Sequence, residues 1–171
     1  MFRKGFTLVE LIIVIAITIV LGVAVVADFT NSGRVSDLRA TTQEIASLLR
    51  QAQSDSISGK QGKVWGVYFD NTNPGAPFYA LYASANGAYT PTSEVGHYAL
   101  PSDLCYISST VPIASSVIIY FNQVSGLPSA STSVSLQLGG CGTVTSAGGT
   151  STISQSGSGE IFFDSFNRSN L

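Results

Sequence analysis

The sequence predicts an α+β protein in which one long N-terminal helix precedes an antiparallel, β-rich head. Three observations predict this class: an apolar run near the N-terminus, an amphipathic stretch after it, and short β-type segments separated by turn residues over the rest of the chain. The predicted parts are a short basic segment, a membrane helix, an amphipathic helix and a globular head, at residues 1–5, 6–27, 28–60 and 61–171.

The first long element is an apolar run. Residues 6–27 are apolar except for Thr7, Glu10, Thr18 and Gly22. At about 1.5 Å of rise per residue, a helix of this length matches the roughly 30 Å hydrocarbon core of a bilayer. Arg3 and Lys4 precede the run, and positive charges favour the cytoplasmic side of a membrane. We therefore expect a single-pass segment in the cytoplasmic membrane, with the N-terminus inside and the head outside.

Three interpretations fit such a segment: a plain anchor, a signal peptide removed after Val25-Val26-Ala27, or a short leader removed ahead of the apolar run. Glu10 favours the third, because an ionisable side chain within a membrane costs about 2–3 kcal/mol and usually has a function. A cut between Gly5 and Phe6 would create a free amine on Phe6. The Glu10 carboxylate would then pair with the terminal amine of a neighbouring subunit and set the register of assembly.

The run Gly5-Phe6-Thr7-Leu8-Val9-Glu10-Leu11 resembles the class III signal of type IV prepilins and type II secretion pseudopilins. The resemblance implies that residues 1–5, with Arg3 and Lys4, are a prepilin leader. It also implies cleavage after Gly5, N-methylation of Phe6, and a role in assembly for Glu10. The implied fold is the type IV pilin-like fold. The implied partners are the prepilin peptidase/methyltransferase, other pilin or pseudopilin subunits in a helical filament, the inner-membrane assembly platform and the membrane.

The second half of the helix is predicted from an amphipathic pattern in residues 28–60. Apolar or small side chains recur every three or four residues, at Val35, Leu38, Thr41, Ile45, Leu48, Leu49, Ala52 and Ile57. Asn31-Ser32-Gly33 predicts a break or a mild kink, and Gly59 with Gly62 predicts the end of the helix. The stretch Ile45–Ile57 is similar to the H-type minor pseudopilins and their pilus relatives, as is Gly157–Phe162 in the head.

The head is predicted to contain seven short strands rich in β-branched and aromatic residues. They are Val64–Phe69, Phe78–Tyr82, His97–Leu100, Val117–Phe121, Val134–Leu138, Ser151–Gln155 and Glu160–Phe163. The segment from Asp70 to Gly75 is predicted to be a turn, because a calcium loop would need side-chain oxygens where Thr72 and Pro74 stand. The aromatic residues of these strands form either an adhesive patch or ordinary core and cross-strand pairs, and we expect the latter.

The charges of the head argue against several functions. The stretch from Val64 to Asn167 contains five acidic residues and no lysine or arginine, so we expect no direct binding of nucleic acid. His97 is the sole histidine and has no sequence signal of an activated serine beside it. One histidine and two distant cysteines do not match the spacing of a zinc site. We therefore expect no catalytic site, no metal and no cofactor.

The two cysteines, Cys105 and Cys141, have two possible states. In an oxidising compartment they would close one disulfide, which in the chain-entropy model contributes about 3–4 kcal/mol. Two buried free thiols are the alternative, since sequence spacing alone does not establish the geometry.

Together these patterns predict a structural subunit and not an enzyme. The expected function is a minor pilin or pseudopilin that is processed by prepilin peptidase and assembles through its N-terminal helix. It would reside first in the cytoplasmic membrane and then in an extracytoplasmic filament. The alternative is an ordinary secreted or membrane-anchored β-domain, a binding module or hydrolase, with a conventional signal peptide.

Overall fold

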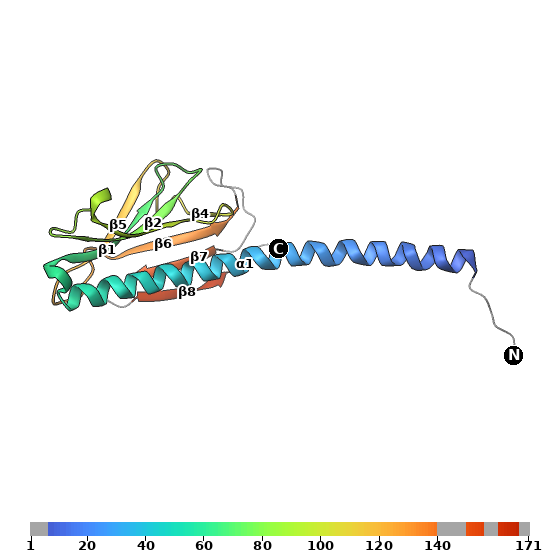
Figure 1. Cartoon of the computed structure of the whole chain (residues 1–171), viewed down its shortest axis with the longest axis horizontal. Coiled ribbons are helices and arrows are strands. Elements are labelled where there is room, and N and C mark those ends of the chain that lie inside the picture. Colours follow the sequence, from blue (N-terminus) through green and yellow to red (C-terminus); the bar gives the residue numbers. More distant parts are fainter. Residues whose placement is uncertain (1–6, 140–149, 156–160, 168–171) are drawn as a thin grey trace. The chain divides into compact units, whose positions relative to one another are not determined.

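The computed structural model describes residues 7–139, 150–155 and 161–167 (Figure 1). The fold class is α+β, as predicted, with one long helix followed by two antiparallel sheets. The chain divides into two compact units, Met1–Val35 and Ser36–Leu171. The β-rich part therefore belongs entirely to the second unit.

Helix α1 spans Leu8–Ile57. Asn31-Ser32-Gly33 lies within it, so the predicted break there is wrong; a glycine inside a helix costs only about 1 kcal/mol relative to alanine. In the part of the chain that is described, none of the helices has both the length and the apolar character that a membrane crossing requires. The predicted end of the helix is confirmed, because Gly59 adopts a left-handed conformation (φ 60°) and the short 3-10 helix η1, Lys60–Gly62, follows.

The inner face of α1 in the second unit is apolar or small. Its buried residues are Leu38, Thr41, Thr42, Ile45, Ala46, Leu48, Leu49, Ala52 and Ser56. Most of the predicted stripe is thus confirmed. The exceptions are Val35, which is only partly buried, and Ile57, which is 50% exposed. In place of Ile57, Ser56 turns inward, accepts a hydrogen bond from the Trp65 N–H at 2.8 Å and donates one to the Trp65 carbonyl at 3.3 Å.

Sheet A has the strand order β3-β2-β1-β5. Its strands are β1 Val64–Asp70, β2 Phe78–Ser84, β3 Glu94–Ala99 and β5 Ser116–Phe121. The register pairs Val67 with Leu81 on one side and with Ile119 on the other, so these three side chains share the inner face. All three are at most 3% exposed, which places the core on this side.

Sheet B has the order β4-β6-β7-β8. Its strands are β4 Leu104–Tyr106, β6 Thr132–Leu138, β7 Thr150–Gln155 and β8 Ile161–Asn167. Every predicted strand overlaps an observed one, although Glu160 lies outside the described residues. Strand β4 was not predicted. Strand β3 begins three residues earlier than expected, at Glu94, and the short 3-10 helix η2, Pro91–Ser93, precedes it.

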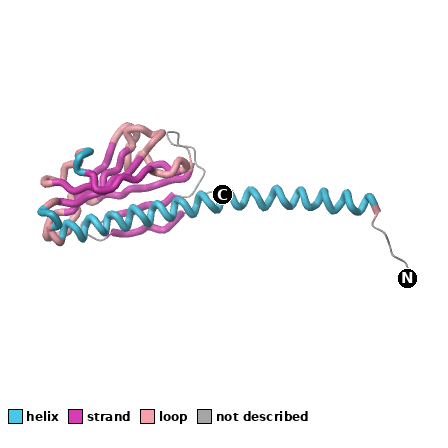
Figure 2. Tube along the Cα trace, in the orientation of Figure 1, coloured by secondary structure: helices cyan, strands magenta, loops and turns pink. Residues whose placement is uncertain are grey.

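The two sheets and the second half of α1 enclose one core (Figures 1 and 2). Tyr106 of β4 links the sheets: its ring meets Phe69 edge-on at 6.1 Å, and its hydroxyl donates to the Phe78 carbonyl at 2.9 Å. Burial and a hydrogen bond with Glu44 of α1 raise the pKa of Tyr79, whose ring stacks on Tyr98. The prediction that aromatic residues form cross-strand pairs is confirmed for this pair.

Candidate functional site

Helix α1 begins directly after Thr7, and the side chain of Thr7 caps it. The Thr7 Oγ1 accepts a hydrogen bond from the Glu10 N–H at 3.3 Å, and the Thr7 carbonyl accepts one from the Leu11 N–H at 3.2 Å. Threonine is a favoured N-cap because its hydroxyl satisfies an N–H group that has no partner in the first turn. Glu10 is thereby held in the first turn, near the positive end of the helix dipole.

Sequence reasoning missed this contact between Thr7 and Glu10. The signal was available, because threonine followed three residues later by glutamate is the spacing of a capping box. In a capping box either glutamate or glutamine serves at the third helical position. The bond seen here uses the backbone N–H of Glu10, which any residue except proline could supply, so it assigns no capping role to the Glu10 side chain.

The first turns of α1 present an apolar surface on all sides. The large apolar side chains that are at least half exposed are Leu8, Val9, Leu11, Ile12, Ile13, Val14, Ile15, Ile17, Ile19, Val20 and Leu21. The hydroxyl of Thr18 donates to the Val14 carbonyl at 2.7 Å. A surface of this kind is stable only when lipid or other apolar helices cover it.

The remaining predicted site residues lie in different places. The leader and cleavage residues, Arg3, Lys4, Gly5 and Phe6, lie outside the described residues. Cys105 lies in β4, is 4% exposed and is disulfide-bonded. Its predicted partner Cys141 lies outside the described residues, so the pairing of these two cysteines stays a prediction.

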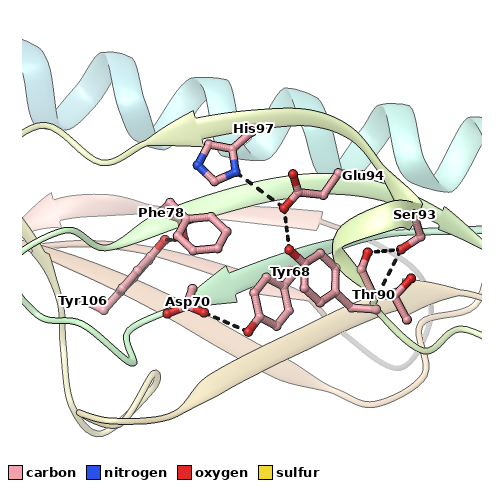
Figure 3. A network of polar contacts seen from close by, with 9 residues as sticks. Tyr68, Asp70, Phe78, Thr90, Ser93, Glu94, His97 and Tyr106 are labelled. Carbon is pink, nitrogen blue, oxygen red and sulfur yellow. Dashed lines mark hydrogen bonds and ion pairs between the residues drawn. The ribbon is translucent and has the colours of Figure 1, made fainter.

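A polar and aromatic cluster lies on the outer face of sheet A, opposite the core (Figure 3). In β1, the Tyr68 hydroxyl donates to Asp70 Oδ2 at 2.8 Å. Asp70 Oδ1 accepts from the Thr72 N–H at 2.8 Å and from the Thr72 hydroxyl, and this confirms the turn predicted after β1. Burial alone would raise the pKa of Asp70, but the hydrogen bonds from Thr72 and Tyr68 outweigh it and lower the pKa of this carboxyl.

Tyr89 connects Tyr68 and Asp70 to the edge strand of sheet A. Its ring stacks on Tyr68 at 3.7 Å with an interplanar angle of 2°, and its hydroxyl donates to Glu94 Oε1. The loop that carries Tyr89 is held by Tyr82, whose hydroxyl donates to the Gly87 carbonyl at 2.7 Å. Burial, followed by the bond to Glu94, raises the pKa of Tyr89. These phenols are therefore neutral donors at neutral pH, and they hold the two carboxylates in place.

His97 completes the cluster at strand β3. Its Nδ1 lies 3.5 Å from Glu94 Oε1, and its ring stacks on Phe78 with centroids 4.3 Å apart. The side chain is 52% exposed, as expected for a surface histidine. The side chains in this cluster bind one another, which is the arrangement of a structural network. Among the described residues, no three potential ligands gather where a metal ion could bind.

One comparison bears directly on the N-terminal helix. Residues 1–26 match the family model of the prokaryotic N-terminal methylation motif. The chain carries a class III signal. No curated protein and no solved structure matches this chain.

The class III signal accounts for the apolar residues at the start of α1. The motif supports a precursor of the type IV pilin or pseudopilin type, and it implies in general processing by prepilin peptidase and assembly into filaments. It also indicates that the precursor is anchored in a membrane. The resemblance that the sequence suggested for residues 5–11 is therefore confirmed at the level of the signal.

Proposed function

We propose that the chain is a structural subunit, a minor pilin or pseudopilin, of a type IV pilus or a type II secretion pseudopilus. The match of residues 1–26 to the methylation motif carries this proposal. The exposed apolar surface of α1 supports it, because a monomer in water would not maintain such a surface. The resemblance of Ile45–Ile57 to the H-type minor pseudopilins favours a minor subunit.

In the proposed pathway, the precursor inserts through residues 6–27 with Arg3 and Lys4 on the cytoplasmic side. Prepilin peptidase removes residues 1–5 and methylates the new N-terminus at Phe6. The subunit then leaves the bilayer, and its apolar helix exchanges lipid for the helices of neighbouring subunits. The head remains outside the cytoplasm throughout, where a disulfide at Cys105 would persist.

In this pathway, the Glu10 carboxylate pairs with the terminal amine of a neighbouring subunit. Both charges lie in an apolar setting, so an unpaired carboxylate would be costly and a wrong register would be penalised. Within the described residues, the only contact of Glu10 with another side chain goes through its backbone N–H, to Thr7. Its carboxylate is therefore available for a neighbour.

The processing step is tested by the N-terminus and intact mass of the protein from the membrane fraction of the producing cell. A mature chain that begins at N-methylated Phe6 is expected. A chain that begins at Asp28 would mean conventional signal-peptide cleavage, and it would remove Glu10 from the mature protein altogether.

The role of the Glu10 charge is tested with two substitutions that both keep the backbone bond to Thr7. Glu10→Ala removes the charge and most of the side chain, whereas Glu10→Gln removes the charge and retains a residue that suits a capping box. We expect both variants to be cleaved, and both to enter filaments at least about tenfold less than wild type, a factor that corresponds to roughly 1.4 kcal/mol. Normal incorporation of Glu10→Gln would mean that assembly does not depend on the charge of Glu10.

A further inference from the structure

The two edges of sheet A differ in how they are covered. At β5, the segment after the strand folds back on the edge, with bonds from the Asn122 N–H to the Leu127 carbonyl and from the Ser129 N–H to the Tyr120 carbonyl, both at 2.8 Å. Strand β3 forms the opposite edge. An uncovered edge strand exposes a row of N–H and C=O groups that can pair with another chain.

The orientation of the β3 backbone follows from one hydrogen bond at its end. The Leu100 N–H donates to the Pro77 carbonyl at 2.9 Å, and bonded pairs alternate with non-bonded pairs in an antiparallel ladder. The register pairs Ala99 with Phe78 and His97 with Ala80, so these are the non-bonded pairs. The N–H and C=O groups of His97 and Ala99 therefore point away from β2.

Nothing in the described part of the chain covers this side of β3. No hydrogen bond to the backbone of His97 or Ala99 is formed there by any described residue. Val95 is 56% exposed, and the His97 side chain is 52% exposed. Natural edge strands are usually protected by lysine, proline or a bulge. Strand β3 contains neither residue, and its bulge lies at the start of the strand, opposite Leu81 and Tyr82.

The side chains beside this edge carry negative charge. Glu94 is the charged residue of β3, and its contacts with Tyr89 and His97 both use Oε1 (Figure 3). The stretch from Val64 to Asn167 contains no lysine or arginine. A partner that binds here would gain from positive charge on the face that Glu94 shares.

We propose that the free edge of β3 binds an extended, positively charged segment of another protein by strand addition. The backbone groups of His97 and Ala99 offer two donors and two acceptors. They repeat at about 6.8 Å, which is the two-residue period of a β-strand. A polypeptide strand matches this pattern of alternating donors and acceptors. Lysine or arginine side chains on the outer face of the added strand would lie next to Glu94.

The probes are two synthetic peptides, acetyl-Thr-Lys-Val-Lys-Val-Lys-Thr-amide and the same sequence with glutamate for lysine. Each is added to the full chain in detergent micelles, and amide hydrogen exchange is followed residue by residue. The lysine peptide is expected to slow exchange at His97 and Ala99 by at least about fivefold. Gly96 and Tyr98 should change little, because their N–H groups already bond to β2. Unchanged exchange at His97 and Ala99 at millimolar peptide would overturn the proposal.

Three variants separate the contribution of the β3 backbone to peptide binding from the contribution of its side chains. His97→Pro removes an outward N–H together with the imidazole, at a position where edge strands tolerate proline, whereas His97→Ala removes the imidazole and keeps that N–H. We expect the proline variant to bind the lysine peptide at least about tenfold more weakly and the alanine variant to bind within about threefold of wild type. Glu94→Gln should reduce the preference for the lysine peptide over the glutamate peptide.

Slow exchange at Gly96 and Tyr98 verifies that each variant keeps the β2–β3 ladder. If His97→Pro disturbs the ladder, the test uses Ala99→Pro instead, because that variant removes the second outward N–H. A proline variant with an intact ladder and wild-type binding would show that the peptide does not add to this edge.

Discussion

Replacing Gly66 with alanine is a direct test of how sheet A is packed. Gly66 lies in β1, between β2 and β5, and opposes Tyr120 of β5. The Tyr120 carbonyl bonds outward to Ser129, so Gly66 and Tyr120 form a non-bonded pair, the kind in which side chains approach most closely. A Cβ on Gly66 would lie 2.6 Å from the Ile119 carbonyl oxygen and 2.8 Å from the Tyr120 Cβ.

The expected cost follows from this overlap. Ordinary contact begins at 3.4 Å, so the new methyl group would intrude by about 0.8 Å on the backbone of β5, which its ladder with β1 holds in place. Overpacking of this kind costs about 1–3 kcal/mol. Alanine also restricts the unfolded chain more than glycine does, and this smaller loss of entropy on folding stabilises the protein by about 0.4–1 kcal/mol. Taking the middle of both ranges, we expect Gly66→Ala to lower the free energy of unfolding by about 1.3 kcal/mol.

The assay is urea unfolding of the full chain in a non-denaturing detergent, followed by the fluorescence of Trp65. This residue is the sole tryptophan and is 2% exposed, so its emission reports the head. Gly75→Ala is the matched control, because its Cβ would meet only Asn73 Oδ1, at 3.4 Å. The control should stay within about 0.5 kcal/mol of wild type. Equal unfolding midpoints for both variants would refute the packing argument.

Two further predictions concern the same fold. Ser56→Ala leaves the buried Trp65 N–H without its side-chain acceptor and should cost about 1–3 kcal/mol in urea unfolding, whereas Ser47→Ala, at an exposed site, should cost less than about 0.5 kcal/mol. Alkaline pH should also destabilise the head, because burial raises the pKa of the tyrosines that pack in it. The tyrosines concerned are Tyr68, Tyr79, Tyr82, Tyr89 and Tyr106. Their phenols ionise first in the unfolded chain, so stability is complete below about pH 10 and falls above it. Ionisation of these five phenols and loss of the fold should then appear together; their ionisation in a head that stays folded just above pH 10 would contradict this.

The elements that depend on a local sequence pattern could be predicted from the sequence. The apolar run, the spacing of three and four that begins at Val35, and the glycine at position 59 each encode their structure within a few residues. The same is true of the turn after β1, because Asp70 bonds to a residue only two positions away. The class III signal is equally local, since it occupies a short run at the start of the chain.

The features that could not be predicted depend on contacts between distant segments. Strand β4, Leu104–Tyr106, has three residues and exists because it pairs with β6, about 30 positions further along the chain. Ile57 continues the apolar stripe in sequence, yet the helix ends there and Ser56 takes the inward position. The bond between Tyr89 and Glu94 requires the preceding loop to fold over the outer face of sheet A, which no periodicity encodes.

The central position of β1 has a mechanical consequence. The chain leaves α1 at Ile57 and enters sheet A at Val64, after only the short helix η1. Strand β1 is paired along seven positions with β2 and along six with β5. A pull on the helix that reached the head would therefore load two ladders at once, and both would have to rupture before β1 could be extracted. An edge strand in the same place would peel away one bond at a time.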